Sequence, residues 1–124
     1  MKFVLILAGI FSGLAVVLGA FAAHGLKNRL AENLLSAFQT GVNYQFLHAL
    51  ALILIFILAR LLPHTLWNWS AGFMIAGIVC FSGSLYMLAM TGIKWFGPIT
   101  PLGGLFFIIG WLIFVMAALQ SVEP

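Results

Sequence analysis

The chain contains no aspartate, and its only acidic residues are Glu32 and Glu123. Charged residues make up 6% of its 124 residues, whereas hydrophobic residues make up 65%. A water-soluble domain of this size needs a polar exterior, which five basic and two acidic side chains cannot supply. Such a composition is stable where lipid surrounds most of the surface. The sequence therefore predicts an integral membrane protein.

The shortage of acids also excludes several kinds of site. Without aspartate there is no Ser-His-Asp triad, and the sequence shows no pair of intramembrane carboxylates for cation coupling. We therefore predict no catalytic residue, no metal site and no cofactor, and we expect the protein not to be an enzyme. Cys80 is the only cysteine, so an intramolecular disulfide is excluded. Five scattered cations do not form a nucleic-acid surface, and no nucleic-acid partner is expected.

Four hydrophobic runs are long enough to cross a bilayer. They predict spans over about 3–23, 43–62, 67–90 and 101–120 within one membrane domain, 1–124. Each span must be helical, because unpaired backbone groups are not tolerated in lipid. The predicted fold is an all-α four-transmembrane-helix bundle. Its first run resembles an export signal, but about 20 uncharged residues exceed the roughly 7–15 of a signal core, which favours a retained helix.

The linker between spans one and two has an amphipathic pattern. Its polar stripe consists of Arg29, Glu32, Asn33, Ser36 and Gln39, and its apolar stripe consists of Leu30, Leu34, Ala37 and Phe38. This pattern predicts a separate short helix over about 28–40, lying in the membrane interface or capping the bundle. We interpret it as a covering linker, with a gate or a partner-docking element as the alternative.

Small residues recur at helix-packing spacing along several spans. Such residues let helices approach closely in lipid. The candidate packing positions are Gly9, Gly13, Gly19, Gly72, Ala76, Cys80, Ser84, Gly103, Gly104 and Gly110. The positions from Gly72 to Ser84 follow one another at i+4 and predict a helix–helix seam along span three. Because these faces outnumber what one bundle needs, we expect a homo-oligomer or a membrane-protein partner.

Polar residues gather near one end of the predicted spans. The residues of this candidate polar pocket are His24, Asn43, Tyr44, Gln45, His48, Tyr86, Thr91 and Thr100. One interpretation is that neutral His48 joins two helices by hydrogen bonds. One alternative is a site for a ligand, a lipid headgroup or a proton. The other is a metal site, for which two histidines and a remote Glu32 supply few coordinating groups. Trp111, deep in span four, needs a partner for its indole N–H.

The basic residues are nearly balanced between the two membrane sides. Lys27, Arg29 and Lys94 lie in the linkers on one side, whereas Lys2 and Arg60 lie on the other side with the terminal amine. An even number of spans puts both termini on the same side. The Met-Lys start favours both termini inside the cell.

Four stretches of the chain carry a family resemblance. They are "GAFAAHGLK" at 19–27, "YQFLHALALI" at 44–53, "FSGSLYMLAMTG" at 81–92 and "ITPLGGLFFIIGW" at 99–111. Together, and in this order, they resemble the uncharacterised membrane family called domain of unknown function four-two-three, which includes YgdD-like and YwdK-like bacterial inner-membrane proteins and animal relatives known only as transmembrane proteins. Ala22 departs from the family pattern, which often has glycine before Ala-His-Gly. The resemblance implies a small four-helix protein of the bacterial plasma membrane and no known substrate.

Two main hypotheses of function remain. The first is a non-enzymatic scaffold, assembly partner or lipid-interacting module, with membrane lipids as its surroundings. The second is a small oligomeric transporter or channel that uses a polar pocket at His24 and His48. A third hypothesis, an enzyme acting on a lipid or quinone, lacks an identifiable acid–base set.

Overall fold

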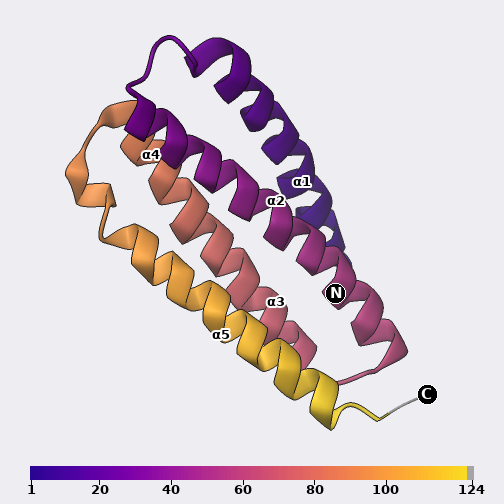
Figure 1. Ribbon diagram of the computed structural model, residues 1–124. Coiled ribbons are helices and arrows are strands. Elements are labelled where there is room, and N and C mark those ends of the chain that lie inside the picture. The colour runs from indigo at the N-terminus through magenta and orange to yellow at the C-terminus, as the bar shows by residue number, and fades with distance from the viewer. Residues whose placement is uncertain (123–124) are drawn as a thin grey trace.

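The computed structural model describes residues 1–122, which are helical almost throughout (Figure 1). The elements are α1 (Lys2–Phe21), η1 (Ala22–Leu26), α2 (Glu32–Leu61), α3 (Leu66–Gly77), η2 (Ile78–Ser82), α4 (Gly83–Thr91), η3 (Lys94–Phe96) and α5 (Ile99–Gln120). The π-helical turn η1 extends α1, and the π-helical turn η2 joins α3 to α4 in one continuous rod. Four helical segments are long and apolar enough to cross a membrane, which confirms the predicted fold class. Glu123 lies outside the described residues.

The predicted interfacial helix over 28–40 is wrong as a separate element. Residues 27–31 form a turn, and α2 runs without a break from Glu32 to Leu61. No proline interrupts this stretch, so the amphipathic segment continues directly into the second span. At 30 residues α2 is roughly 45 Å long, which exceeds the roughly 30 Å hydrocarbon core of a bilayer. Its first turns therefore carry the predicted polar stripe at the membrane surface.

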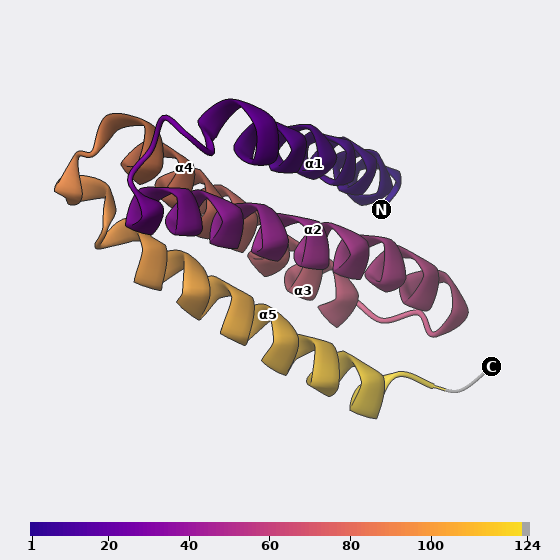
Figure 2. The same cartoon turned by 45° about the horizontal axis from the view of Figure 1, so that its top comes forward.

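The helices form an open row that follows the chain order. α1 packs mainly on α2, α2 packs on the α3–η2–α4 rod, and that rod packs on α5. Figures 1 and 2 show α1 and α5 at opposite edges of this row, with α2 between them. Because α1 and α5 do not close against each other, grooves remain open along the sides of α2.

The interior has two apolar clusters separated by a layer of hydrogen-bonding side chains. One cluster is centred on Leu52, Ile55 and Trp67, toward the end that carries the termini. The other joins Ala22, Leu26, Phe38 and Ala89 near the turn between α1 and α2. Both clusters consist of residues that are almost fully buried, so they fix the depth at which the polar layer lies.

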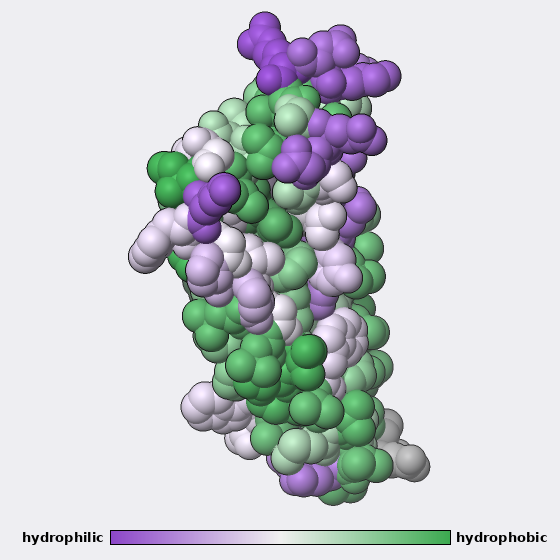
Figure 3. Space-filling model, turned by 60° about the vertical axis from the view of Figure 1, so that its left-hand side comes forward, coloured by the Kyte–Doolittle hydropathy of each residue, from purple (hydrophilic) through white to green (hydrophobic). Residues whose placement is uncertain are grey.

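The outer surface is apolar along most of its length. Figure 3 shows hydrophilic residues gathered at the ends of the molecule, mainly at the end that carries the α1–α2 turn, with hydrophobic side chains covering much of the middle. Large apolar side chains such as Phe3, Val16 and Leu112 are more than half exposed. This distribution fits a protein whose middle lies in hydrocarbon and whose ends lie in the headgroup region.

Candidate functional site

Gln45 connects three helices at the level of the polar layer. Its Nε2 donates a hydrogen bond to the backbone carbonyl of Phe11 in α1 at 2.8 Å. Its Oε1 accepts a hydrogen bond from the Tyr86 hydroxyl in α4 at 2.6 Å. Nearby, the Ser82 hydroxyl donates to the carbonyl of Gly41 at 2.7 Å. These bonds satisfy polar groups that would otherwise be costly in lipid, so this part of the predicted pocket holds the helices together.

His48 lies at the centre of the same layer and is 2% exposed. The indole N–H of Trp111 donates to His48 Nε2 at 3.1 Å, so this nitrogen is an acceptor and the imidazole is neutral. The proton then resides on Nδ1, which donates to the carbonyl of Tyr44 at 2.8 Å. The ring stacks on Phe107 with centroids 3.6 Å apart and planes 11° apart. His48 therefore joins α2 to α5, and Trp111 has the partner that its indole requires.

A groove between α2 and α5 opens beside this histidine. Its volume is about 450 Å³. It is lined by Tyr44, Leu47, His48, Phe81, Gly104, Phe107, Ile108 and Trp111. Tyr44 is 43% exposed, and its ring lies 4.8 Å from that of Phe81 between centroids. At Gly104 an added Cβ would approach only the edge of the Phe81 ring, at 3.9 Å, so open space remains above this glycine.

The structure does not bring all the predicted pocket residues together. His24 is exposed in η1, close to the apolar cluster that contains Phe38 of α2. His48 lies ten residues after Phe38, which is roughly 15 Å along the axis of α2. Thr91 is exposed at the end of α4, and its hydroxyl donates to the carbonyl of Met87. Thr100 shares a 2.6 Å hydrogen bond with Ser84 and bonds to neither histidine. A single pocket that contains His24 and His48 is therefore not formed.

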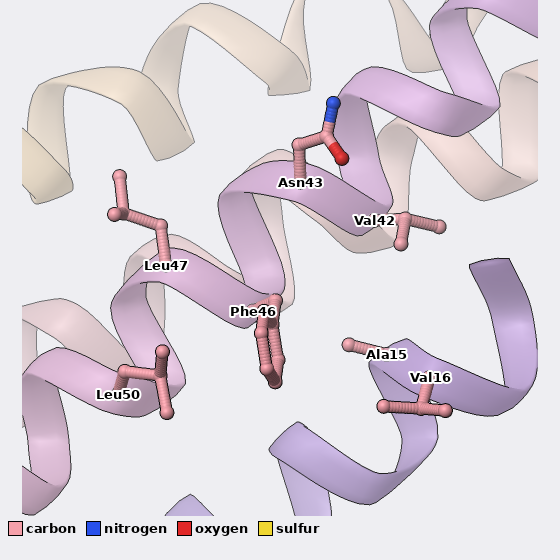
Figure 4. Close-up of a pocket in the computed structure, with 7 residues that line it drawn as sticks. All are labelled: Ala15, Val16, Val42, Asn43, Phe46, Leu47 and Leu50. Carbon is pink, nitrogen blue, oxygen red and sulfur yellow. The ribbon is translucent and has the colours of Figure 1, made fainter.

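Asn43 lies at the edge of a second groove, between α1 and α2, and its side chain points away from α1 (Figure 4). It is exposed, and the volume of this groove is about 280 Å³. This groove is lined by Ala15, Val16, Val42, Asn43, Phe46, Leu47 and Leu50 (Figure 4). In the figure, Phe46 reaches from α2 toward Ala15 and Val16 of α1. Leu47 lines both grooves, so one exposed ridge of α2 separates them.

The predicted small-residue positions divide into packed and open ones. Gly103 lies against the backbone of Phe81, Gly110 against Met74 and Gly19 against Val42. In contrast, a Cβ added at Gly9, Gly13 or Gly72 would meet no atom within 4 Å. The predicted seam along span three is wrong as a single face of this chain. Gly72 is exposed and Ser84 is buried, with the half-buried Ala76 and Cys80 between them.

Several residues at the centre of the structure do not stand out in the sequence. Phe107 stacks on His48, and Ser70 donates to the carbonyl of Gly110 at 2.8 Å. Gly77 packs so closely on Phe107 that a side chain there would collide with the ring. The spacing of Gly103, Phe107 and Trp111 at i+4 is a signal that places them on one face of α5. Among residues 1–122, no group of three His, Cys, Asp or Glu residues is close enough to hold a metal ion.

Comparison with known proteins finds relatives that are named as membrane proteins. The chain is 48% identical over 121 residues to the UPF0382 membrane protein YwdK of Bacillus subtilis (strain 168), covering 97% of this chain and 98% of that protein. It is 41% identical over 122 residues to the UPF0382 membrane protein SH2409 of Staphylococcus haemolyticus (strain JCSC1435), covering 98% and 99%. It is 42% identical over 120 residues to a UPF0382 membrane protein of Staphylococcus epidermidis (strain ATCC 12228 / FDA PCI 1200), covering 97% and 98%.

No solved structure is significantly similar to this chain. Residues 18–104 match the family described as protein of unknown function (DUF423), and this match covers more than half of the chain. The family resemblance found in the sequence is thereby confirmed. Together with the four candidate membrane spans, these findings establish that the chain is a multi-pass membrane protein and that it belongs to the DUF423 family.

Proposed function

We propose that this protein is a non-enzymatic, lipid-interacting module and that the groove between α2 and α5 holds the apolar part of a membrane lipid. The observation that carries this proposal is the groove of about 450 Å³ beside buried His48, which opens where lipid surrounds the chain. Aromatic rings line it and offer flat apolar faces to an acyl chain or a ring system. A lipid reaches such a groove sideways from the bilayer.

The chemistry of the groove favours a lipid over an ion. Both ring nitrogens of His48 are engaged in hydrogen bonds. Within residues 1–122 the only carboxylate side chain, Glu32, is exposed at the start of α2, roughly 24 Å along the helix from His48. The hydroxyl of Tyr44 is then the one polar side-chain group in the lining without a hydrogen bond to the described part of the chain. This arrangement supports a non-enzymatic binding role.

The cellular location belongs to the same proposal. The relatives named above are bacterial membrane proteins. An all-helical chain with four candidate spans fits the plasma membrane, which is the inner membrane of bacteria that have two. Membrane lipids are accordingly the proposed partners.

The test fills the groove with a side chain. A Cβ added at Gly104 would meet only the Phe81 ring, at 3.9 Å, so Gly104→Leu extends a side chain into the groove. Leucine favours the helix more than glycine does, and we expect the fold to be retained. Gly9→Leu is the matched control, because Gly9 faces open space but lies on α1. We expect mass spectrometry of protein purified in mild detergent to show a bound lipid in the wild type and in Gly9→Leu, and most of it lost in Gly104→Leu.

Equal lipid content in all three proteins would contradict the proposal. Circular dichroism of each variant shows whether the helical fold is retained. A lipid that is lost equally from both variants would point to annular lipid around the whole molecule and would also contradict a specific groove.

A further inference from the structure

The groove between α2 and α5 is short for its volume. Its lining on α5 runs from Gly104 to Trp111, which is seven residues or roughly 10 Å along the helix axis. An extended acyl chain is longer, because two chains end to end span the roughly 30 Å hydrocarbon core of a bilayer. The groove volume of about 450 Å³ is three times the roughly 150 Å³ of an apolar cavity that binds benzene. This shape fits a ring system better than an extended chain.

Near-parallel rings form one wall of the groove. The imidazole of His48 stacks on Phe107 with 11° between the planes. The Tyr44 ring lies within 16° of the His48 plane and within 26° of the Phe107 plane. Tyr44 lines the groove and is 43% exposed, so its ring is accessible to a ligand. Because aromatic rings attract each other in offset stacks, a planar ring in the groove extends this arrangement.

Gly104 keeps the α5 side of the groove low. Glycine has no side chain, and a Cβ added at this position would meet only the Phe81 ring, at 3.9 Å. A flat ring can therefore lie close to the backbone of α5. A larger residue at this position would occupy the same space.

The Tyr44 hydroxyl determines the polar chemistry of the groove. The other polar side chains of the lining are already bonded, since the Trp111 indole donates to His48 and the second ring nitrogen of His48 donates to a backbone carbonyl. The Tyr44 hydroxyl is thus the remaining donor in an otherwise apolar lining. A ligand that matches it carries an acceptor, such as a carbonyl oxygen, on its ring.

We propose that this groove binds an isoprenoid quinone, with the quinone ring stacked on the rings of the groove and one ring carbonyl accepting a hydrogen bond from the Tyr44 hydroxyl. Membrane quinones combine a flat ring, carbonyl oxygens and an apolar tail, which extends sideways from the groove into the bilayer. A phospholipid has carbonyl groups only in flexible esters and has no ring to stack. The quinone site rests on the proposed lipid-binding function and names the class of lipid.

Two matched compounds separate stacking from hydrogen bonding. Dimethylnaphthoquinone has the fused rings of a membrane quinone without its tail, and dimethylnaphthalene has the same rings without carbonyl oxygens. Isothermal titration calorimetry on the full chain in mild detergent, with empty micelles as the blank, measures both. We expect the wild type to bind the quinone more tightly. We expect Tyr44→Phe to raise the dissociation constant of the quinone roughly five-fold, because one hydrogen bond is lost, and to leave that of dimethylnaphthalene unchanged.

Variants at two glycines show where the quinone binds. We expect Gly104→Leu to abolish binding of both compounds and Gly9→Leu to leave it unchanged, because only Gly104 lines the groove. Quinone binding that survives in Gly104→Leu overturns the inference. The inference is also overturned if Tyr44→Phe binds the quinone as well as the wild type does, or if the wild type binds both compounds equally.

Mass spectrometry of the purified protein distinguishes this failure from failure of the proposed function. A phospholipid that the wild type carries and Gly104→Leu loses, without any binding of dimethylnaphthoquinone, overturns the quinone site and supports the lipid-binding function. A wild type that carries no lipid and binds no quinone contradicts both.

Discussion

The positions of single polar residues in the membrane-spanning part of this protein are explained by the hydrogen bonds that they make to other residues of the chain. Trp111 and His48 illustrate this, because the indole N–H of Trp111 is a donor and Nε2 of His48 is the acceptor that it needs. The sequence identifies both residues as polar groups that need partners. It does not show that they are partners of each other, since 63 residues separate them. Only the packing of α5 near α2 brings them together.

Ser12 and Ser82 provide a comparison of two intramembrane serines. The Ser82 hydroxyl donates to Gly41, whereas the buried Ser12 hydroxyl has no hydrogen-bond partner in the described part of the chain. We expect Ser82→Ala to lower the free energy of unfolding by roughly 0.5–1.5 kcal/mol. We expect Ser12→Ala to leave it unchanged or to raise it slightly, because no bond is lost. Unfolding in detergent, followed by circular dichroism, compares the two, and equal losses would contradict this account.

The candidate site was therefore only partly predictable at this scale. Gln45, His48 and Tyr86 lie in one layer, as their grouping in the sequence suggests. His24 does not join them, because η1 ends near the surface while α2 continues inward. Asn43 and Tyr44 are neighbours in sequence but line different grooves, since successive residues of a helix point about 100° apart. Their separation follows from where the other helices lie, which the pattern of one helix does not contain.

At the scale of elements, hydropathy predicted the four membrane-spanning helices but not the π-helical turns within them. The π-helical turn η2 lies between Ala76 and Ser84 and adds a residue to the local turn. Positions that recur at i+4 before it are therefore out of phase with those after it. This is the physical reason why the expected seam from Gly72 to Ser84 is exposed at one end and buried at the other.

Two adjacent glycines of α5 test how closely this helix packs on η2. A side chain at Gly103 would collide with the backbone of Phe81, which cannot rotate away, whereas a Cβ added at Gly104 would meet only the Phe81 ring, at an ordinary contact distance of 3.9 Å. We expect Gly103→Ala to lower the free energy of unfolding by roughly 1–3 kcal/mol. We expect Gly104→Ala to be neutral or to raise it by up to about 1 kcal/mol. Parallel unfolding curves in the same detergent decide between them, and a harmless Gly103→Ala would mean that α5 and η2 are further apart.

At the scale of the whole molecule, an even number of spans predicts that both termini face the same side. Figure 1 shows the start of α1 and the end of α5 toward the same end of the helices. The basic residues are nearly balanced between the two sides, so we expect the orientation to be sensitive to single charges.

Reporter fusions at each terminus test this orientation. We expect both termini to lie in the cytoplasm of the wild type. Lys2→Gln should lower the fraction of chains with cytoplasmic termini, because it removes a retained charge from that side, and Lys94→Gln should raise it. Termini on opposite sides would contradict the four-span topology.

The open row also has a consequence for how the protein is made. Each span packs mainly on the span that precedes or follows it along the chain. During synthesis, each span after the first can therefore pack on the preceding span, which is already in the membrane when it is inserted. Assembly requires no waiting for a distant segment, and short sequence separations between contacts favour rapid folding. Synthesis from the N-terminus to the C-terminus can therefore build this protein in the order in which it is read.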